Sequence, residues 1–121
     1  MRISRQKLNP SLEKEVSRLF FQTVIDLKTP EAVETFFGDI FSRSEMTAII
    51  KRLAVAYWLA QKRSYENIRT NLKVSSATIA SVDRRRKHGK GIQAAIKLIE
   101  ADRWAEEWAR KIRGLVKRDQ K

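Results

Sequence analysis

Residues 64–88 read SYENIRTNLKVSSATIASVDRRRKH and contain two short amphipathic segments on either side of a turn. Ser64 can cap a first helix, whose isoleucine and leucine fall on one face. Ser75 or Ser76 can cap a second helix after a turn of three or four residues. Two short helices joined by such a turn are typical of a helix-turn-helix. We therefore predict a helix-turn-helix over about residues 64–88.

The second helix of this motif begins with small and hydrogen-bonding side chains. A recognition helix places its N-terminal residues in the major groove of DNA. There, hydroxyl groups can contact bases or phosphates, and an alanine methyl group can meet a thymine methyl group. Ile79 and Val82 fall on the opposite, buried side of the helix. The exposed residues that we predict to meet DNA are Ser75, Ser76, Ala77, Ala80 and Ser81.

The same helix ends in the cationic run RRRK at residues 84–87. This run spans a full helical turn, so its side chains cannot all face one groove. We predict that Arg84, Arg85 and Lys87 contact phosphates, which fix the register on DNA without reading its sequence. The alternative is a basic helix end that is simply solvated and stabilised by the helix dipole.

Positive charge is concentrated in the second half of the chain. The 121 residues carry a formal net charge of +12. Residues 62–121 hold 17 basic and seven acidic side chains, so this half alone has a net charge of +10. Such an excess favours a polyanionic partner, because each neutralised phosphate releases counterions. An acidic protein or an anionic membrane surface would satisfy the same charge.

The remaining sequence also predicts helices throughout. Thr29 and Pro30 suit the start of a helix, and SRSE at residues 42–45 fits a capping box. Gly89 and Gly91 are expected to adopt the left-handed conformation that ends helices. We therefore predict an all-α chain.

Residues 92–117 carry two apolar stripes, one near the start of this segment and one through its two tryptophans. The stripes are out of phase, which predicts either two helices or one bent helix. We divide the chain into a helix-turn-helix domain at residues 1–100 and a basic amphipathic helical extension at residues 101–121. The extension packs on the domain or on a partner subunit, or lies on an anionic membrane, and its interleaved acidic residues favour packing.

The sequence carries no feature of an enzyme, a metal site or a membrane protein. It lacks cysteine and has one histidine, His88, so we expect no metal site and no histidine-based catalytic triad. It has neither a glycine-rich phosphate loop nor a catalytic carboxylate cluster, and we expect no catalytic residues and no cofactor. The charged N-terminus lacks a signal-peptide core, and no apolar run approaches membrane-spanning length. We expect a cytoplasmic protein without a membrane partner.

Four blocks of the sequence carry a family resemblance: FFGD at residues 36–39, RLAVAYWL at 52–59, SYENI at 64–68 and SSATIASV at 75–82. From about Leu19 to Ile99, the chain resembles the Trp-repressor superfamily, and more closely its Trp-repressor-like YerC/YecD group. The resemblance implies an intertwined, all-helical homodimer whose paired helix-turn-helices meet successive major grooves. It also implies DNA contacts at Arg69, Ser76, Ala77, Thr78 and Ala80.

One position departs from the family's pattern. Where Trp repressor has an arginine that packs against bound tryptophan, this chain has Ser81. The second arginine of that ligand site aligns with Lys51 or, after a shift of one residue, with Arg52. Serine offers neither the planar stacking surface nor the bidentate carboxylate contact of arginine. We therefore do not expect tryptophan to control this protein, and the existence of another small-molecule effector is left open.

Large apolar side chains crowd onto the two helical segments before residue 42. A small monomer would have difficulty burying all of them, and large exposed apolar patches usually mark association. These segments therefore predict a homodimer, with a compact monomeric bundle as the alternative. The residues are Phe20, Phe21, Val24, Ile25, Phe36, Phe37, Ile40 and Phe41.

Together, these features predict a sequence-specific, duplex-DNA-binding transcriptional regulator that uses a helix-turn-helix. One alternative is an RNA-binding protein or a helper protein that binds nucleic acid without sequence preference. Another is an interaction protein whose basic face meets an acidic partner. The sequence indicates neither the operator nor the sign of regulation.

Overall fold

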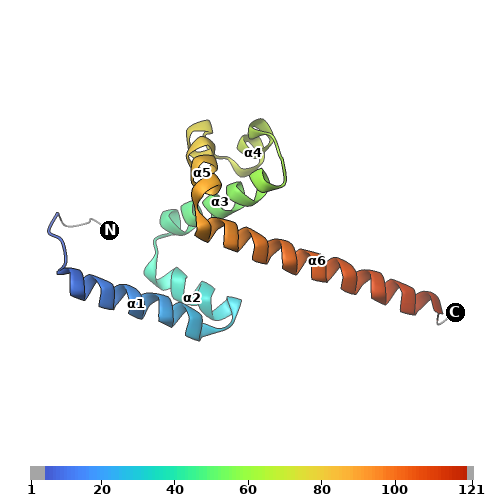
Figure 1. Cartoon of the computed structure of the whole chain (residues 1–121), viewed down its shortest axis with the longest axis horizontal. Coiled ribbons are helices and arrows are strands. Elements are labelled where there is room, and N and C mark those ends of the chain that lie inside the picture. Colours follow the sequence, from blue (N-terminus) through green and yellow to red (C-terminus); the bar gives the residue numbers. More distant parts are fainter. Residues whose placement is uncertain (1–4, 120–121) are drawn as a thin grey trace. The chain divides into compact units, whose positions relative to one another are not determined.

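The computed structural model describes residues 5–119, and every regular element in that range is an α-helix. The predicted all-α class is confirmed for this part of the chain. The helices are α1 (Pro10–Leu27), α2 (Pro30–Ile40), α3 (Arg43–Ala60), α4 (Tyr65–Leu72), α5 (Ser76–His88) and α6 (Lys90–Asp119) (Figure 1). None of the helices in the described range is long and apolar enough to cross a membrane. The chain divides into two compact units, one ending at Met46 and the other beginning at Thr47.

Local hydrogen bonds start α2 and α3 where the sequence predicts. The Thr29 hydroxyl accepts the backbone N–H of Ala32 at 3.2 Å, and Pro30 occupies the first turn of α2. The Ser42 N–H donates to the Glu45 carboxylate at 2.8 Å, and the Glu45 N–H donates to the Ser42 hydroxyl at 3.2 Å. The Ser42 N–H also holds the pKa of Glu45 below its usual value. The predicted capping box is therefore confirmed.

The first unit has no described residue that is fully buried. Its helices α1 and α2 lie side by side, and phenylalanine rings fill the contact between them. Phe20 stacks on Phe37 with ring centroids 6.3 Å apart, and Phe37 meets Phe41 edge-to-face at 5.3 Å. Phe21 and Ile25 remain 64% and 68% exposed. Within this unit, the helices therefore leave large apolar side chains uncovered.

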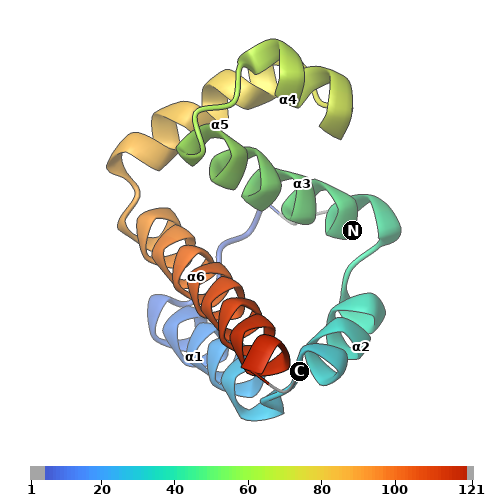
Figure 2. The same ribbon diagram turned by 90° about the vertical axis from the view of Figure 1, so that its right-hand side faces the viewer.

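The second unit contains the buried core of the described chain. Helices α4 and α5 contact each other, and α5 also contacts α6, while α3 supplies the largest share of the core (Figures 1 and 2). Full burial of an aliphatic side chain contributes about 1.5–3 kcal/mol, so this cluster stabilises the α4–α5 pair on α3. The buried residues are Val55, Ala56, Leu59, Ile68, Ile79, Val82 and Ile96.

The predicted role of the two glycines is wrong. Neither is left-handed: Gly89 has a φ of −84°, and Gly91 lies within α6, while the described residues with positive φ are lysines. Gly89 is needed for a different reason. Its N–H donates to the carbonyl oxygen of Arg85 at 2.6 Å, and a β-carbon on Gly89 would lie 2.6 Å from that same oxygen. A close backbone approach, rather than backbone handedness, therefore selects glycine between α5 and α6.

The two apolar stripes of residues 92–117 lie on one continuous helix, α6. Of the two sequence-based alternatives, the single helix is therefore observed. Its first turns contribute Ile96 to the core, with Ile92 packed beside it. The tryptophan stripe belongs to the later turns, where Trp104 and Trp108 are exposed.

We expect Gly89→Ala to lower the free energy of unfolding by about 1–3 kcal/mol, because the added methyl group collides with a backbone oxygen. Gly91→Ala is the matched control, since a β-carbon there has no neighbour within 4 Å. That variant should be unchanged or more stable by up to about 1 kcal/mol. Urea unfolding of the full chain measures both effects. A Gly89→Ala variant as stable as the wild type would contradict this account.

Candidate nucleic-acid interface

Hydrogen bonds fix both ends of α4, including the turn that leads to α5. The Ser64 hydroxyl caps α4 by accepting the N–H of Asn67 at 3.1 Å. Lys73 ends α4 in the left-handed conformation, with a φ of 55°. The Lys51 ammonium group of α3 donates to the Lys73 carbonyl oxygen at 3.2 Å. This bond satisfies a carbonyl at the helix end and ties the turn to α3.

Ser75, rather than Ser76, caps the start of α5. The Ser75 hydroxyl accepts the N–H of Thr78 at 3.1 Å and donates to the Thr78 hydroxyl oxygen at 2.9 Å. The hydroxyl proton of Ser75 is therefore occupied, whereas that of Thr78 can still be donated. On the opposite side of α5, Ile79 and Val82 are buried, as the sequence predicts.

The residues predicted to contact DNA differ in their exposure. All lie on α4, α5 or the turn that joins them. The exposed members are Arg69, Ser75, Ser76, Ala77, Arg84, Arg85 and Lys87. The half-buried members are Thr78, Ala80 and Ser81.

Asp83 is a hub that the sequence analysis missed. Its carboxylate accepts the Tyr65 hydroxyl at 2.7 Å and the Arg86 guanidinium at 2.9 Å, and the Lys87 ammonium lies 3.9 Å away. The Tyr65 hydrogen bond, followed by the Arg86 hydrogen bond and the Lys87 charge, holds the pKa of Asp83 below its usual value. The same hydrogen bond raises the pKa of Tyr65. The hub connects the first turn of α4 to the middle of α5.

This hub divides the basic run of α5 into two pairs. Arg86 and Lys87 turn toward Asp83, and the Arg86 side chain is only 27% exposed. Arg84 and Arg85 are exposed and form no salt bridge with a described residue. Their guanidinium groups are therefore available to an external anion, while Arg86 is engaged inside the fold. The pairing of Asp83 with Arg86 and Lys87 could have been predicted, because these cations follow it by three and four residues in the same helix. The hydrogen bond from Tyr65 could not, because no local pattern links the two residues.

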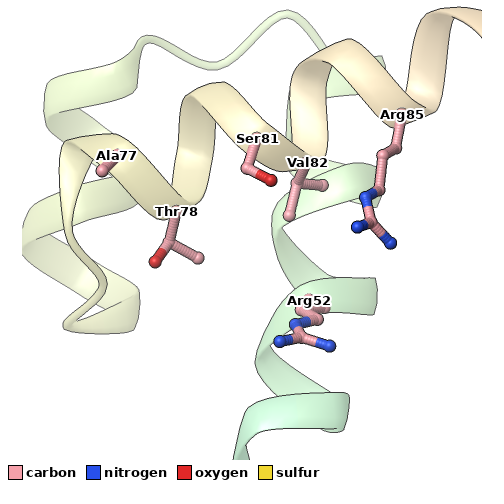
Figure 3. Close-up of a pocket in the computed structure, with 6 residues that line it drawn as sticks. All are labelled: Arg52, Ala77, Thr78, Ser81, Val82 and Arg85. Atoms are coloured by element: carbon pink, nitrogen blue, oxygen red, sulfur yellow. The ribbon is translucent and has the colours of Figure 1, made fainter.

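A cavity of about 260 Å³ lies beside this surface, between α3 and α5 (Figure 3). The Arg52 and Arg85 guanidinium groups approach it from the two helices, and Ser81 and Thr78 also line it, with the Thr78 hydroxyl directed away from the arginines. Two cations and the Ser81 hydroxyl suit an oxyanion such as a carboxylate or a phosphate. Of the two residues that the sequence alignment left open, Arg52 lines the cavity, whereas Lys51 is bonded to the turn.

We expect Asp83 to stabilise the fold in a pH-dependent way. Because its pKa is lowered in the folded chain, its contribution is complete above about pH 4 and is lost as the pH falls through that lowered pKa. The Asp83→Asn variant should therefore lose stability at pH 7 and differ less from the wild type in strong acid. Urea midpoints at the two pH values measure this difference.

Carbon NMR of the Asp83 carboxyl group measures the pKa directly. The Tyr65→Phe variant is the control: it removes the largest cause of the shift, so the pKa of Asp83 should rise toward its usual value. An Asp83 that titrates at its usual value in the wild type would exclude the hub as described.

Comparison with known proteins relates most of the chain to one protein family. The chain is 35% identical over 71 residues to the uncharacterized protein YerC of Bacillus subtilis (strain 168), an alignment that covers 59% of this chain and 67% of that protein. No solved structure matches the chain significantly. The family model of the Trp repressor protein matches residues 15–97, which include α2 to α5 and the start of α6. The chain therefore belongs to the Trp repressor family.

Proposed function

We propose that this protein is a dimeric transcriptional regulator that binds duplex DNA in a sequence-dependent way through a helix-turn-helix formed by α4 and α5. One observation carries the proposal. Helix α5 presents exposed small residues at its N-terminus and two exposed arginines, free of salt bridges with described residues, near its C-terminus. Membership of the Trp repressor family supports the same function.

The N-terminal end of α5 is the part that we assign to the major groove. Ser76 and Ala77 are exposed there, and Ser75 caps the helix from the preceding turn. A hydroxyl and a methyl group can contact base edges, but neither forms the bidentate pair with a base that gives strong discrimination. Direct readout is therefore modest, and part of the selectivity comes from DNA shape.

The exposed cations are the part that we assign to phosphates. Arg84 and Arg85 lie on α5, and Arg69 lies in the last turn of α4. Phosphate contacts supply affinity that is independent of sequence and sensitive to salt. In this proposal the small residues select the site, and the arginines hold the helix in its groove.

The Arg84→Ala, Arg85→Ala double variant should bind duplex DNA more weakly and with a flatter salt dependence. Each lost phosphate contact lowers the slope of log affinity against log salt by about 1. The measurement is a titration of duplex DNA, selected from genomic fragments that the protein retains, at several salt concentrations. Lys14→Ala with Arg18→Ala is the matched control, because it removes the same charge from exposed positions on α1 and should keep the slope.

Competitors in the same titration separate the alternatives. Unselected duplex DNA should compete less well than the selected fragment, and structured RNA should compete no better than unselected duplex. RNA that outcompetes every duplex would assign the protein to RNA instead. Equal salt slopes for the wild type and the Arg84, Arg85 variant would refute the DNA-binding role of α5.

The same proposal excludes tryptophan as the controlling ligand. Ser81 occupies the position at which the family's pattern has a stacking arginine, and the planar cation that α5 brings to the cavity is instead Arg85, about one helical turn further on. Adding L-tryptophan to the titration should leave the DNA affinity unchanged. An oxyanion effector for the Arg52–Arg85 cavity is compatible with the proposal but is not required by it.

The proposed dimer forms through the uncovered faces of α1 and α2. In sedimentation at micromolar concentration, the wild type should have at least the mass of a dimer. Phe21→Ser with Ile25→Ser should reduce that mass without unfolding the chain, because both side chains are already mostly exposed. Circular dichroism checks the fold. A monomeric wild type would refute the dimer and, with it, the simultaneous binding of two grooves.

A further inference from the structure

The later turns of α6 form an apolar helix face that nothing covers within their own unit. We call residues 101–117 the distal segment of α6. This segment continues past the family match, which ends at residue 97. The core contacts of α6 come from earlier turns, at Ile92 and Ile96. In Figure 1, the distal segment runs away from α3, α4 and α5 without a helix of that unit beside it.

Four large side chains share one face of the distal segment. Trp104, Trp108, Ile112 and Leu115 follow one another at helical spacing and are between 48% and 63% exposed. The two indole rings contact each other, with centroids 5.7 Å apart. A contiguous exposed face of this kind marks an association surface rather than a solvated helix.

Charge is separated along the same segment. The acidic residues Asp102, Glu106 and Glu107 lie in its first half, and the basic side chains follow from residue 110 onward. None of these acids forms a salt bridge with a described residue. The one cation in the first half, Arg103, is already engaged, because its guanidinium donates to the Tyr57 hydroxyl at 3.1 Å. The segment is therefore acidic at one end and basic at the other, and Glu107 and Lys111 are the acid and the cation that share one flank of the apolar face.

We propose that the distal segment of α6 pairs in antiparallel orientation with the same segment of a second copy of this chain. Antiparallel pairing places the acidic half of one helix against the basic half of the other, whereas parallel pairing would place like charges together. The midpoints of all the resulting pairs fall between residues 109 and 110. The pairs across the apolar face are Trp104 with Leu115 and Trp108 with Ile112, and on its flank Glu107 lies opposite Lys111.

A second copy fits this face better than a membrane does. An amphipathic helix on an anionic membrane borders its apolar face with lysine and arginine. Here Asp102 and Glu107 border the face, and anionic headgroups would repel them. Self-pairing instead places Glu107 of one copy opposite Lys111 of the other. This inference is independent of the proposed DNA binding, because none of these residues belongs to α4 or α5.

Single cysteines in the full chain test the pairing, since the protein has no cysteine of its own. Ala109→Cys lies at the centre of the pair and should form a covalent dimer with a short bis-maleimide linker. Ala101→Cys is the matched control, because antiparallel pairing separates its two copies by about 25 Å along the axis. Parallel pairing would cross-link Ala101→Cys at least as well as Ala109→Cys and would overturn the proposal.

Charge exchange in the Ala109→Cys background tests the flanks. Glu107→Lys alone and Lys111→Glu alone should each reduce the yield of covalent dimer, because each places like charges opposite one another. The variant with both changes should recover the yield, whereas a surface that only needs apolar contact would not distinguish these variants. Equal yields in all of them would overturn the charge pairing. No cross-linking of Ala109→Cys, together with binding to vesicles of anionic lipid, would assign the face to a membrane.

Discussion

The packing of α4 and α5 against α3 is the constraint on which the candidate interface depends. Each of the three helices contributes one completely buried side chain to a single hydrophobic cluster. These side chains are Val55 of α3, Ile68 of α4 and Ile79 of α5. These aliphatic contacts are not directional, so they set which faces meet without setting the angle of each side chain. Directional bonds complete the arrangement: Lys51 holds the turn, and Asp83 joins the two helices. The exposed side of α5 is thereby presented on a fixed support.

Because Asp83 pairs with only some of the cations that follow it, the four basic side chains of residues 84–87 differ in their availability to an external anion. Arg86 is drawn into the fold, and Lys87 is drawn toward it, whereas Arg84 and Arg85 remain available. Pairing with Asp83 needs no distortion of the helix, because Arg86 and Lys87 follow it by three and four positions and therefore lie on the same helix face. It also means that net charge overstates the number of cations that can meet a polyanion at α5. The proposed phosphate contacts rest on this division more than on the total of +12.

The sequence predicted local features well and longer-range contacts poorly. The caps at Thr29, Ser42 and Ser64 were predictable because each bond closes within one helical turn. The buried face of α5 followed from its apolar period. The Tyr65–Asp83 hydrogen bond joins residues 18 positions apart and depends on how α4 packs against α5. A local sequence pattern therefore does not predict it. Gly89 was misread for a similar reason: its close neighbour is a carbonyl of the preceding helix, and local preference suggests only a left-handed end.

By itself, the sequence determined the helical class, the helix starts, the concentration of positive charge and the apolar faces of α1, α2 and the distal segment of α6. These properties follow from propensity, capping and periodicity, which act within a few residues. Only the tertiary structure decided that Arg52 rather than Lys51 lines the cavity. It also decided that, within the basic run of α5, Arg86 and Lys87 pair with Asp83 whereas Arg84 and Arg85 form no salt bridge with a described residue. Those choices depend on which side chains of separate helices come within hydrogen-bonding distance. The packing of the helices sets these distances, and the periodicity of apolar and charged residues along the sequence does not predict them.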